Sequence, residues 1–291
     1  MSDDDAAEAV GAKPEPVPAF FRLAGGERGE IFQPLPSARS GWSARRLQGP
    51  ATTGLLARAA QRCAQLARPD LQAARASFEL FRPVRLTSTT TRARIVREGH
   101  RLLLVDSFLM QNGETVARAH IFFLAPSANP DGRIWASGDE FPPPPLQVRP
   151  APYNRLYRSE DSQWSADPSL FAQSTRKYLW QGEIDIVENE AATGFGLIAV
   201  ASDLASLVIH WGTRGVQFIN AETTVSFSRL PSGRGVGVAS AGRSAQSGIS
   251  AGSAVLYDAK GAFGVATVTA LAEAGHTILG QASPPKRDAS K

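Results

Sequence analysis

The sequence predicts an α+β fold built by duplication, in which one long helix and a set of antiparallel strands occur twice. A helical pattern over residues 49–67 is followed by strand patterns, and a second helical pattern over 194–211 is followed by similar strand patterns. This order lacks the regular alternation of strand and helix found in doubly wound parallel sheets. A nucleotide-binding fold of that kind is therefore not expected.

The first half begins with the helix, where Leu56 and Ala60 lie on one apolar face. A strand pattern follows over 75–87, and further strand patterns run to residue 124. The last two of these strands are separated by Gln-Asn-Gly at 111–113, which is a strong hairpin signal. These residues predict one helix packed against an antiparallel sheet.

The second half repeats this plan. Ile198, Ala201 and Leu204 fall on adjacent turns of the helix, and a strand pattern follows over 216–231. The segment SAVLYDAKGAFGVATVTAL then predicts another hairpin, with its turn at Asp258 to Gly261.

Each half also contains an arginine and a proline near the end of a strand. In SFELFRPVRL, Arg82 shares the parity of apolar residues and Pro83 cannot donate to a strand ladder. In TVSFSRLP, Arg229 and Pro231 repeat this arrangement. We expect a bulge at the rim of each sheet, and an architectural rather than catalytic role for both arginines.

The chain of 291 residues is expected to contain two domains joined by a proline-rich linker. The acidic and alanine-rich start predicts a disordered tail, and Pro142 to Pro145 exclude helix and central strand. The expected division is a tail at 1–18, a first domain at 19–126, a linker at 127–160, a second domain at 161–275 and a tail at 276–291.

Composition indicates a cytoplasmic protein. The 43% hydrophobic and 20% charged residues suit a protein with a substantial core, and no apolar run is long enough to span a membrane. Cys63 is the only cysteine, and the four histidines form no metal-ligand pattern, so no metal site is expected. The net charge of +4 fits a phosphate-bearing ligand but is too small to indicate nucleic acid.

The order of the motifs resembles the acyl-CoA thioesterases with two fused hotdog folds. The resemblance rests on F-x-L-x-R-P-V, VREGHR and G-x-x-V-A-R-A-H in the first half, and on ASDLAS, FINAETTVSFSRLP and LYDAKGAFGVAT in the second. It covers about residues 41–273. It implies a tandem hotdog fold, each half a long helix wrapped by a curved antiparallel sheet, and hydrolysis of acyl-CoA thioesters in fatty acid metabolism. Coenzyme A would enter as part of the substrate, with no separate cofactor.

Asp203 is the candidate catalytic base. Its helical neighbours Val200 and Leu207 place it at the border of the apolar stripe, where burial would raise the pKa of its carboxyl group. The structural alternative is a surface or hydrogen-bonding carboxylate. The resemblance favours catalysis, because A-S-D-L matches the motif that carries the family's water-activating aspartate.

The resemblance also implies two residues that hold the water. The Ser or Thr position of the family falls on Asn220, which can both donate and accept. The Gln position falls on Val268, which can do neither, and Thr267 and Thr269 point to the opposite face. This departure favours an alternative function, a non-catalytic acyl-CoA or acyl-thioester binding protein of the same fold.

Four further residues are candidates for substrate binding. Gly194 and Gly196 begin the second helix, whose N-terminal amides can polarise a carbonyl group. Arg97 and Arg101, near Arg94, can meet the phosphates of coenzyme A. The partner is therefore expected to be an acyl-CoA, and assembly of copies through the sheets stays open.

Two other enzyme classes were considered. GISAG at 248–252 matches G-x-S-x-G, but the residues after it form a hairpin pattern and not the helix that a nucleophile elbow requires. An enoyl-thioester hydratase needs an aspartate and a histidine close together. Asp203 and His210 are separated by two helical turns, too far apart to share one water unless the helix ends early. The hydratase function is kept as an alternative of the same fold.

Overall fold

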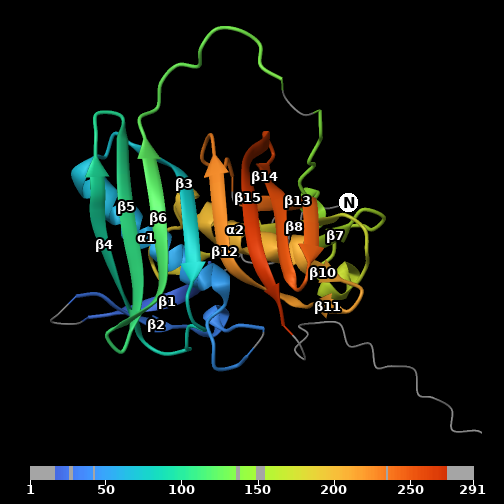
Figure 1. The fold of residues 1–291 in the computed structure, drawn as a ribbon, viewed down its shortest axis with the longest axis horizontal. Coiled ribbons are helices and arrows are strands. Elements are labelled where there is room, and N and C mark those ends of the chain that lie inside the picture. The colour runs from blue at the N-terminus through green and yellow to red at the C-terminus, as the bar shows by residue number, and fades with distance from the viewer. Residues whose placement is uncertain are drawn as a thin grey trace, which may run out of the picture.

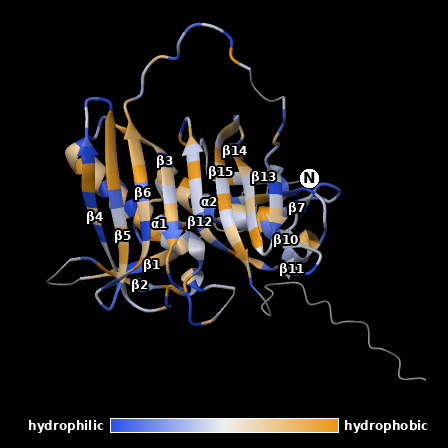
Figure 2. Ribbon diagram, viewed as in Figure 1, coloured by the Kyte–Doolittle hydropathy of each residue, from blue (hydrophilic) through white to orange (hydrophobic). Residues whose placement is uncertain are grey.

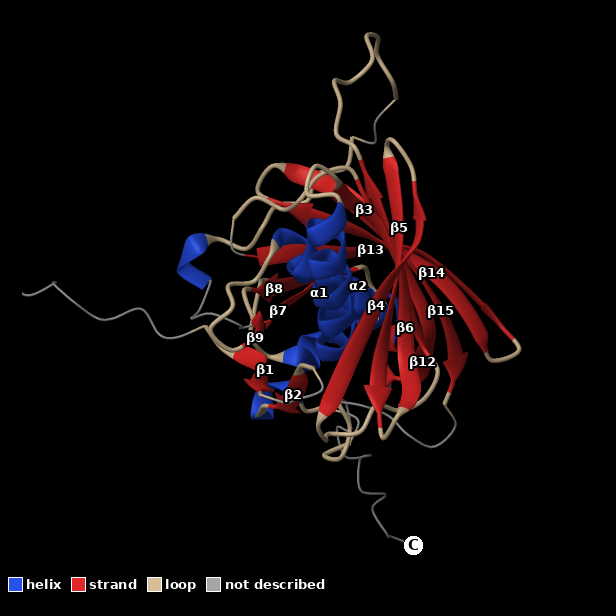
Figure 3. Ribbon diagram, turned by 90° about the vertical axis from the view of Figure 1, so that its left-hand side faces the viewer, coloured by secondary structure: helices blue, strands red, loops and turns tan. Residues whose placement is uncertain are grey.

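A computed structural model describes residues 17–25, 29–41, 43–135, 138–148, 155–233 and 235–273. Apart from residues 17 and 18, the tails predicted at 1–18 and 276–291 lie outside these ranges. Among the described residues, two α-helices are enclosed by one long, strongly curved sheet (Figures 1 and 3). The predicted α+β class is confirmed.

The first half contains α1 (Gly49–Ala67) and the strands β1 (Ala19–Ala24), β2 (Ile31–Pro34), β3 (Gln72–Leu80), β4 (Thr89–Glu98), β5 (Leu102–Gln111) and β6 (Glu114–Leu124). Its helix has the predicted bounds. The hairpin predicted at 111–113 joins β5 to β6, with Asn112 at φ 52° and Gly113 at φ 81°. These positive φ angles are those of a tight hairpin turn, which Asn-Gly adopts readily.

The second half contains α2 (Gly194–His210) and the strands β7 (Arg155–Ser159), β8 (Lys177–Gly182), β9 (Asp185–Val187), β10 (Trp211–Gly212), β11 (Gly215–Val216), β12 (Phe218–Phe227), β13 (Gly235–Gln246), β14 (Ile249–Asp258) and β15 (Gly261–Ala272). Three short 3-10 helices, Pro36–Ala38, Leu146–Val148 and Pro168–Phe171, lie in connections. The predicted turn at Asp258 to Gly261 joins β14 to β15. Strand β7 (Arg155–Ser159) lies inside residues 127–160, the range predicted as a linker.

Within the described residues the sheet has 13 strands in the order β7-β8-β13-β14-β15-β12-β3-β6-β5-β4-β2-β1-β9, and β10 pairs with β11 separately. Strands β3 and β12 join the halves through an antiparallel pairing, with Val225 opposite Ala76. Hydrophilic and hydrophobic residues alternate along several strands (Figure 2), because one face of the sheet covers the helices and the other faces outward.

The two helices pack against each other and run antiparallel. Thr53 on α1 donates a hydrogen bond to the carbonyl of Ala199 on α2, at 2.8 Å. Farther along α1, Gln61 accepts a hydrogen bond from Thr193, the N-cap of α2, at 2.7 Å. The first turn of each helix therefore lies beside the middle of the other helix.

The predicted bulges at Arg82 and Arg229 are wrong, although both residues do lie at a sheet rim. Strand β3 ends at Leu80 and β12 ends at Phe227, so both arginines lie beyond the ladder. Each pairs with an acidic residue at a hairpin turn. Arg229 binds the buried Asp258 through two contacts of 2.6 and 2.8 Å, and Arg82 forms an exposed ion pair with Glu114.

Candidate active site

Asp203 lies in the middle of α2 and its carboxylate packs against the first turn of α1. A Cβ atom added to Gly49, the first residue of α1, would overlap both carboxylate oxygens. Glycine is thus the residue that allows this close approach. The N-terminal end of a helix carries partial positive charge, which favours a carboxylate placed there.

Burial raises the pKa of the Asp203 carboxyl group to about 6, as the sequence pattern led us to expect. Two groups act in the opposite direction. Asn220 Nδ2 donates to Asp203 Oδ1 at 3.0 Å, and the positive charge of Arg155 also lowers the pKa. Near neutral pH the carboxylate is therefore ionised but retains the basicity of a buried group.

Arg155 is held near Asp203 by two amide side chains. Its Nη2 donates to Gln48 Oε1 at 2.6 Å and its Nε donates to Gln181 Oε1 at 2.8 Å. Gln48 is the N-cap residue of α1, and Gln181 on β8 is fully buried. Sequence reasoning missed Arg155 because it stands in the proline-rich region that was interpreted as a linker.

Asn220 and Thr223 on β12 face the same side of the sheet. Residues three apart in a regular strand point to opposite faces, but the ladder between β12 and β15 has an irregularity between Asn220 and Glu222. Thr223 is buried, with its Oγ1 3.5 Å from Asn220 Nδ2. The irregularity thus places the buried Thr223 hydroxyl beside the Asn220 amide, a neighbour that the sequence did not reveal, although Thr223 does not itself line the cavity at Asp203.

The neighbouring strand β15 offers no polar group at this level. Val268 lies opposite Thr223 and Ala270 lies opposite Asn220, and both side chains are buried. Thr267 and Thr269 are exposed on the outer face, as strand alternation predicts. The polar groups that β12 and α2 bring together are therefore those of Asp203, Asn220 and Thr223.

A cavity of about 220 Å³ lies between the two halves at Asp203. The first half supplies most of its wall, from the segment before α1 and from the end of β3 and the residues that follow. The second half supplies Asp203, Ile219 and Asn220. The apolar side chains of the wall are those of Leu47, Leu80, Phe81, Pro83, Val84 and Ile219. An apolar cavity with a few converging polar groups is the usual form of a small-molecule site.

The structure does not bring Gly194 and Gly196 to this cavity. Because the helices are antiparallel, the first turn of α2 lies beside Gln61, and Gly196 lines a separate cavity of about 170 Å³. The helix N-terminus that meets Asp203 is that of α1. Gly49, and not the two predicted glycines, is the residue next to the carboxylate.

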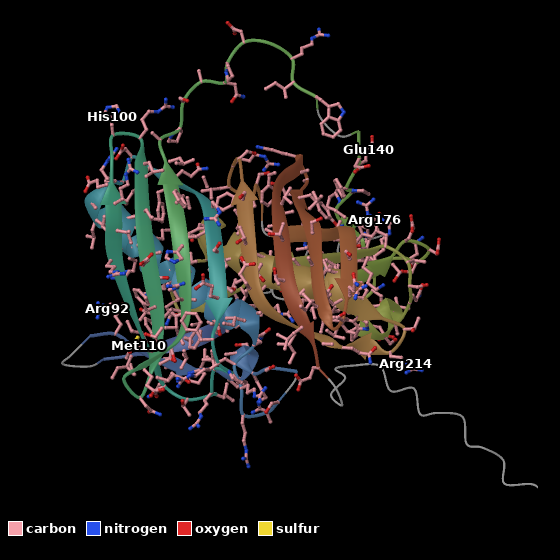
Figure 4. All side chains as sticks on the ribbon, viewed as in Figure 1. Arg92, His100, Met110, Glu140, Arg176 and Arg214 are labelled. Atoms are coloured by element: carbon pink, nitrogen blue, oxygen red, sulfur yellow. The ribbon has the colours of Figure 1, made fainter. Side chains whose placement is uncertain are left out.

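Arg97 and Arg101 also lie away from Asp203. Arg97 is on β4, and Arg101 is in the turn that follows it, where its Nη2 donates to Ser127 Oγ at 3.3 Å. His100 occupies the same hairpin tip at the periphery (Figure 4). Neither arginine lines the cavity at Asp203.

The first half has Arg58 at the position that corresponds to Asp203. Both residues lie nine residues after the first residue of their helix. Arg58 is buried and forms ion pairs with Glu190 at 2.6 Å and Glu30 at 3.0 Å, beside the cavity that Gly196 lines. The two halves are therefore unequal, because α2 carries a buried carboxylate with a raised pKa and α1 carries a guanidinium that is ion-paired with two glutamates.

Within the part of the chain that it describes, the structure does not bring together the side chains that a serine hydrolase or an enoyl-thioester hydratase would need. Ser250 is a fully buried residue of strand β14, so GISAG forms a hairpin and no nucleophile elbow. His210 lies in another cavity and contacts Ser206 and Ser250. Among the described residues, no group of three His, Cys, Asp or Glu side chains is arranged to hold a metal.

Comparison with known proteins supports the resemblance seen in the motifs. Residues 38–124 match the family model described as the acyl-CoA thioesterase N-terminal domain. No curated protein matches the chain by sequence. Several solved structures are similar to this chain over nearly the whole of their own length.

A putative thioesterase II from Thermobifida fusca is similar over 88% of this chain and 96% of its own, with 18% identity and a TM-score of 0.60. A putative thioesterase from Novosphingobium aromaticivorans covers 86% of this chain and 98% of its own, with 15% identity and a TM-score of 0.62. A hotdog-fold protein from Alicyclobacillus acidocaldarius covers 87% and 96%, with 15% identity and a TM-score of 0.60.

These similarities show that the chain has the hotdog fold, and the resemblance to acyl-CoA thioesterases is confirmed. None of the helices in the described ranges combines the length and the apolar character needed to cross a bilayer.

Proposed function

We propose that this chain hydrolyses acyl-CoA thioesters to a free acid and coenzyme A, with Asp203 as the general base. The observation that carries the proposal is the buried Asp203 carboxylate, hydrogen-bonded to Asn220 at the wall of a cavity. A base with a pKa of about 6 is ionised at neutral pH and basic enough to accept a proton from water.

We also propose that each half is one hotdog unit, so that the fold is a tandem hotdog. Each half contributes one long helix and a run of antiparallel strands, and β3 pairs with β12 where the two runs meet. The site then depends on both units, because the second provides Asp203 while the first provides Gly49 and most of the cavity wall.

In the proposed reaction, a water molecule bound by Asp203 and Asn220 attacks the thioester carbonyl carbon. Its proton passes to Asp203 as the new carbon–oxygen bond forms. The negative charge that develops on the carbonyl oxygen is stabilised by the partial positive charge at the N-terminus of α1. The Gly49 amide is the donor available there, because Pro50 has no N–H and the Ala51 amide already donates to the Gln48 carbonyl. Collapse of this intermediate breaks the carbon–sulfur bond, and the leaving thiolate takes up the proton.

A non-catalytic acyl-CoA binding protein is the second candidate. The observation that favours it is the apolar pair Val268 and Ala270, which leaves β15 without a group to hold the water. In the hydrolytic proposal, the Thr223 hydroxyl next to the Asn220 amide supplies the polar group that β15 lacks. Fatty acid metabolism in the cytoplasm and assembly of copies through the sheets stay predictions.

Release of free thiol from acyl-CoA substrates of increasing chain length tests the hydrolytic proposal. We expect measurable turnover by the wild type, and at least about a 100-fold lower kcat for Asp203→Asn, since general-base catalysis commonly contributes this much. Retained binding of acyl-CoA by the variant would show that its site is intact. Equal and negligible rates in both proteins, with acyl-CoA still bound, would leave the binding function.

A further inference from the structure

We propose that a groove lined by Arg45, Arg46, Arg82 and Arg85 binds the phosphates of the coenzyme A moiety. This inference rests on the proposed function, because it assigns the charged end of the same substrate. The groove has a volume of about 810 Å³ and shares Arg46, Arg82 and Pro83 with the wall of the Asp203 cavity. The two hollows are therefore neighbours on one surface.

The backbone that carries these arginines is held in place. Arg46 and Arg85 face each other across an antiparallel bridge. The amide of Leu47 donates to Val84 at 2.9 Å, and the amide of Leu86 donates to Arg45 at 2.8 Å. This short ladder fixes two arginine-bearing segments side by side at the mouth of the cavity.

A buried glutamine fixes the segment further. Gln111 accepts a hydrogen bond from the amide of Arg85 at 3.0 Å and donates to the carbonyl of Arg85 at 2.8 Å. Its side chain thereby replaces a strand partner at this point. The guanidinium groups remain exposed while their backbone is rigid, which reduces the entropy lost on binding a ligand.

The groove carries unbalanced positive charge. Within the described part of the chain, Arg82 forms an ion pair with Glu114, whereas Arg45, Arg46 and Arg85 form none. Like charges placed opposite each other on paired strands are destabilising. An anion bound between them relieves this repulsion, and guanidinium groups bind phosphate through paired hydrogen bonds.

The position of the groove indicates which anion fits. A thioester placed at Asp203 has to connect through an uncharged linker to negative charge at the arginines. Coenzyme A has this chemistry, since its pantetheine arm separates the sulfur from the phosphates. The arginines line a concave groove, which favours a small molecule over the convex surface of an acidic carrier protein.

Calorimetric titration with desulfo-coenzyme A, which cannot be hydrolysed, tests this site without requiring turnover. The proteins compared are the wild type, the double variant Arg45→Ala/Arg85→Ala and the matched control Arg97→Ala/Arg101→Ala. We expect the groove variant to bind desulfo-coenzyme A at least about tenfold more weakly, as loss of charged hydrogen bonds implies. The control is expected to bind as the wild type does, and pantetheine, which lacks these phosphates, is expected to bind all three equally.

Several outcomes would overturn the proposal. These are wild-type affinity in the groove variant, an equal loss in the control, or no binding by the wild type. Loss of hydrolysis of acyl-carrier-protein thioesters alone, with binding of desulfo-coenzyme A unchanged, would assign the groove to a protein partner. Weaker binding of desulfo-coenzyme A by the groove variant, with no hydrolysis of any acyl-CoA by the wild type, would support the groove and refute the hydrolytic function. Unchanged circular dichroism would show that the variants are folded.

Discussion

Asp203 is a carboxyl group whose ionisation acts against the stability of the fold. Burial raises its pKa from 3.8 to about 6, so its neutral form is favoured in the folded state. The corresponding stability is fully present below about pH 4 and is lost as the pH rises through about 6. Above that range, a shift of this size corresponds to about 3 kcal/mol of destabilisation.

We therefore expect Asp203→Asn to stabilise the protein at pH 8 by about 1–3 kcal/mol while it lowers kcat. The advantage should shrink at pH 4, where the wild-type carboxyl group is protonated. Chemical denaturation at both pH values measures this. Asp258→Asn is the control of opposite sign. Burial raises the pKa of Asp258, but Arg229 and the backbone amides of Ser232 and Lys260 together lower it below its ordinary value. An Asp203→Asn variant less stable than the wild type at pH 8 would contradict the account.

The sequence predicted Asp203 and Asn220 as site residues, and the structure brings these two into hydrogen-bond contact at a cavity. It gave no sign of the neighbouring Thr223 and Arg155. Helical spacing predicted the border position of Asp203, and its burial follows from that. Thr223 was not predictable from alternation, because a bulge between Asn220 and Glu222 changes which residues share a face. Arg155 is held near Asp203 by the amide side chains of Gln48, the N-cap of α1, and Gln181 on β8. Both are distant from Arg155 in the sequence, so no local pattern predicts these contacts.

The packing direction of α1 and α2 determines which helix N-terminus lies beside the Asp203 carboxylate. Their antiparallel packing places the first turn of α1 at Asp203 and the first turn of α2 at Gln61. The sequence predicted both helices and proposed the N-terminus at Gly194 and Gly196 for the carbonyl group, whereas the structure places the N-terminus of α1 beside Asp203. The relative direction of two packed helices is a tertiary property that neither helical pattern records.

A substitution at each helix start separates these assignments. Gly49→Ala places a methyl group on the Asp203 carboxylate, so we expect at least about a tenfold fall in kcat. The added methyl group of Gly196→Ala meets the Thr193 hydroxyl at 3.2 Å and Ile186 at 3.6 Å, away from Asp203, and should leave kcat within about twofold. Thiol release by the two variants provides the comparison. A larger loss of kcat in Gly196→Ala than in Gly49→Ala would indicate that the N-terminus of α2, and not that of α1, lies beside the substrate carbonyl group.

Across the whole molecule, Arg58 connects parts that are distant in sequence. It joins α1 to Glu30, next to β2, and to Glu190, just before α2. The sequence predicted a duplicated fold but not this inequality between its halves. A duplicated fold leads one to expect similar residues at corresponding positions of α1 and α2. Here the position carries Arg58 in α1 and Asp203 in α2. The continuous sheet was equally unpredictable, because the pairings of β3 with β12 and of β1 with β9 join segments far apart in the chain.

We expect Arg58→Ala to lower the free energy of unfolding by about 2–4 kcal/mol, because it removes a buried partner of two carboxylates. Glu30 and Glu190 are partly exposed and can regain water, so the loss should fall below that of a fully buried pair. Denaturant titration measures the change, with exposed Arg62→Ala as the control. An unchanged stability in Arg58→Ala would show that the ion pairs contribute nothing to holding the halves together.

The most direct test of the central claim is the pH dependence of kcat for acyl-CoA hydrolysis. With Asp203 as the base, the wild-type rate should rise through about pH 6 and level off above it. Asn220→Ala removes a hydrogen bond that lowers the pKa of Asp203, so its rise should move to higher pH. A rate that is constant through this range, or an Asn220→Ala profile moved to lower pH, would contradict the assignment of Asp203 as the catalytic base.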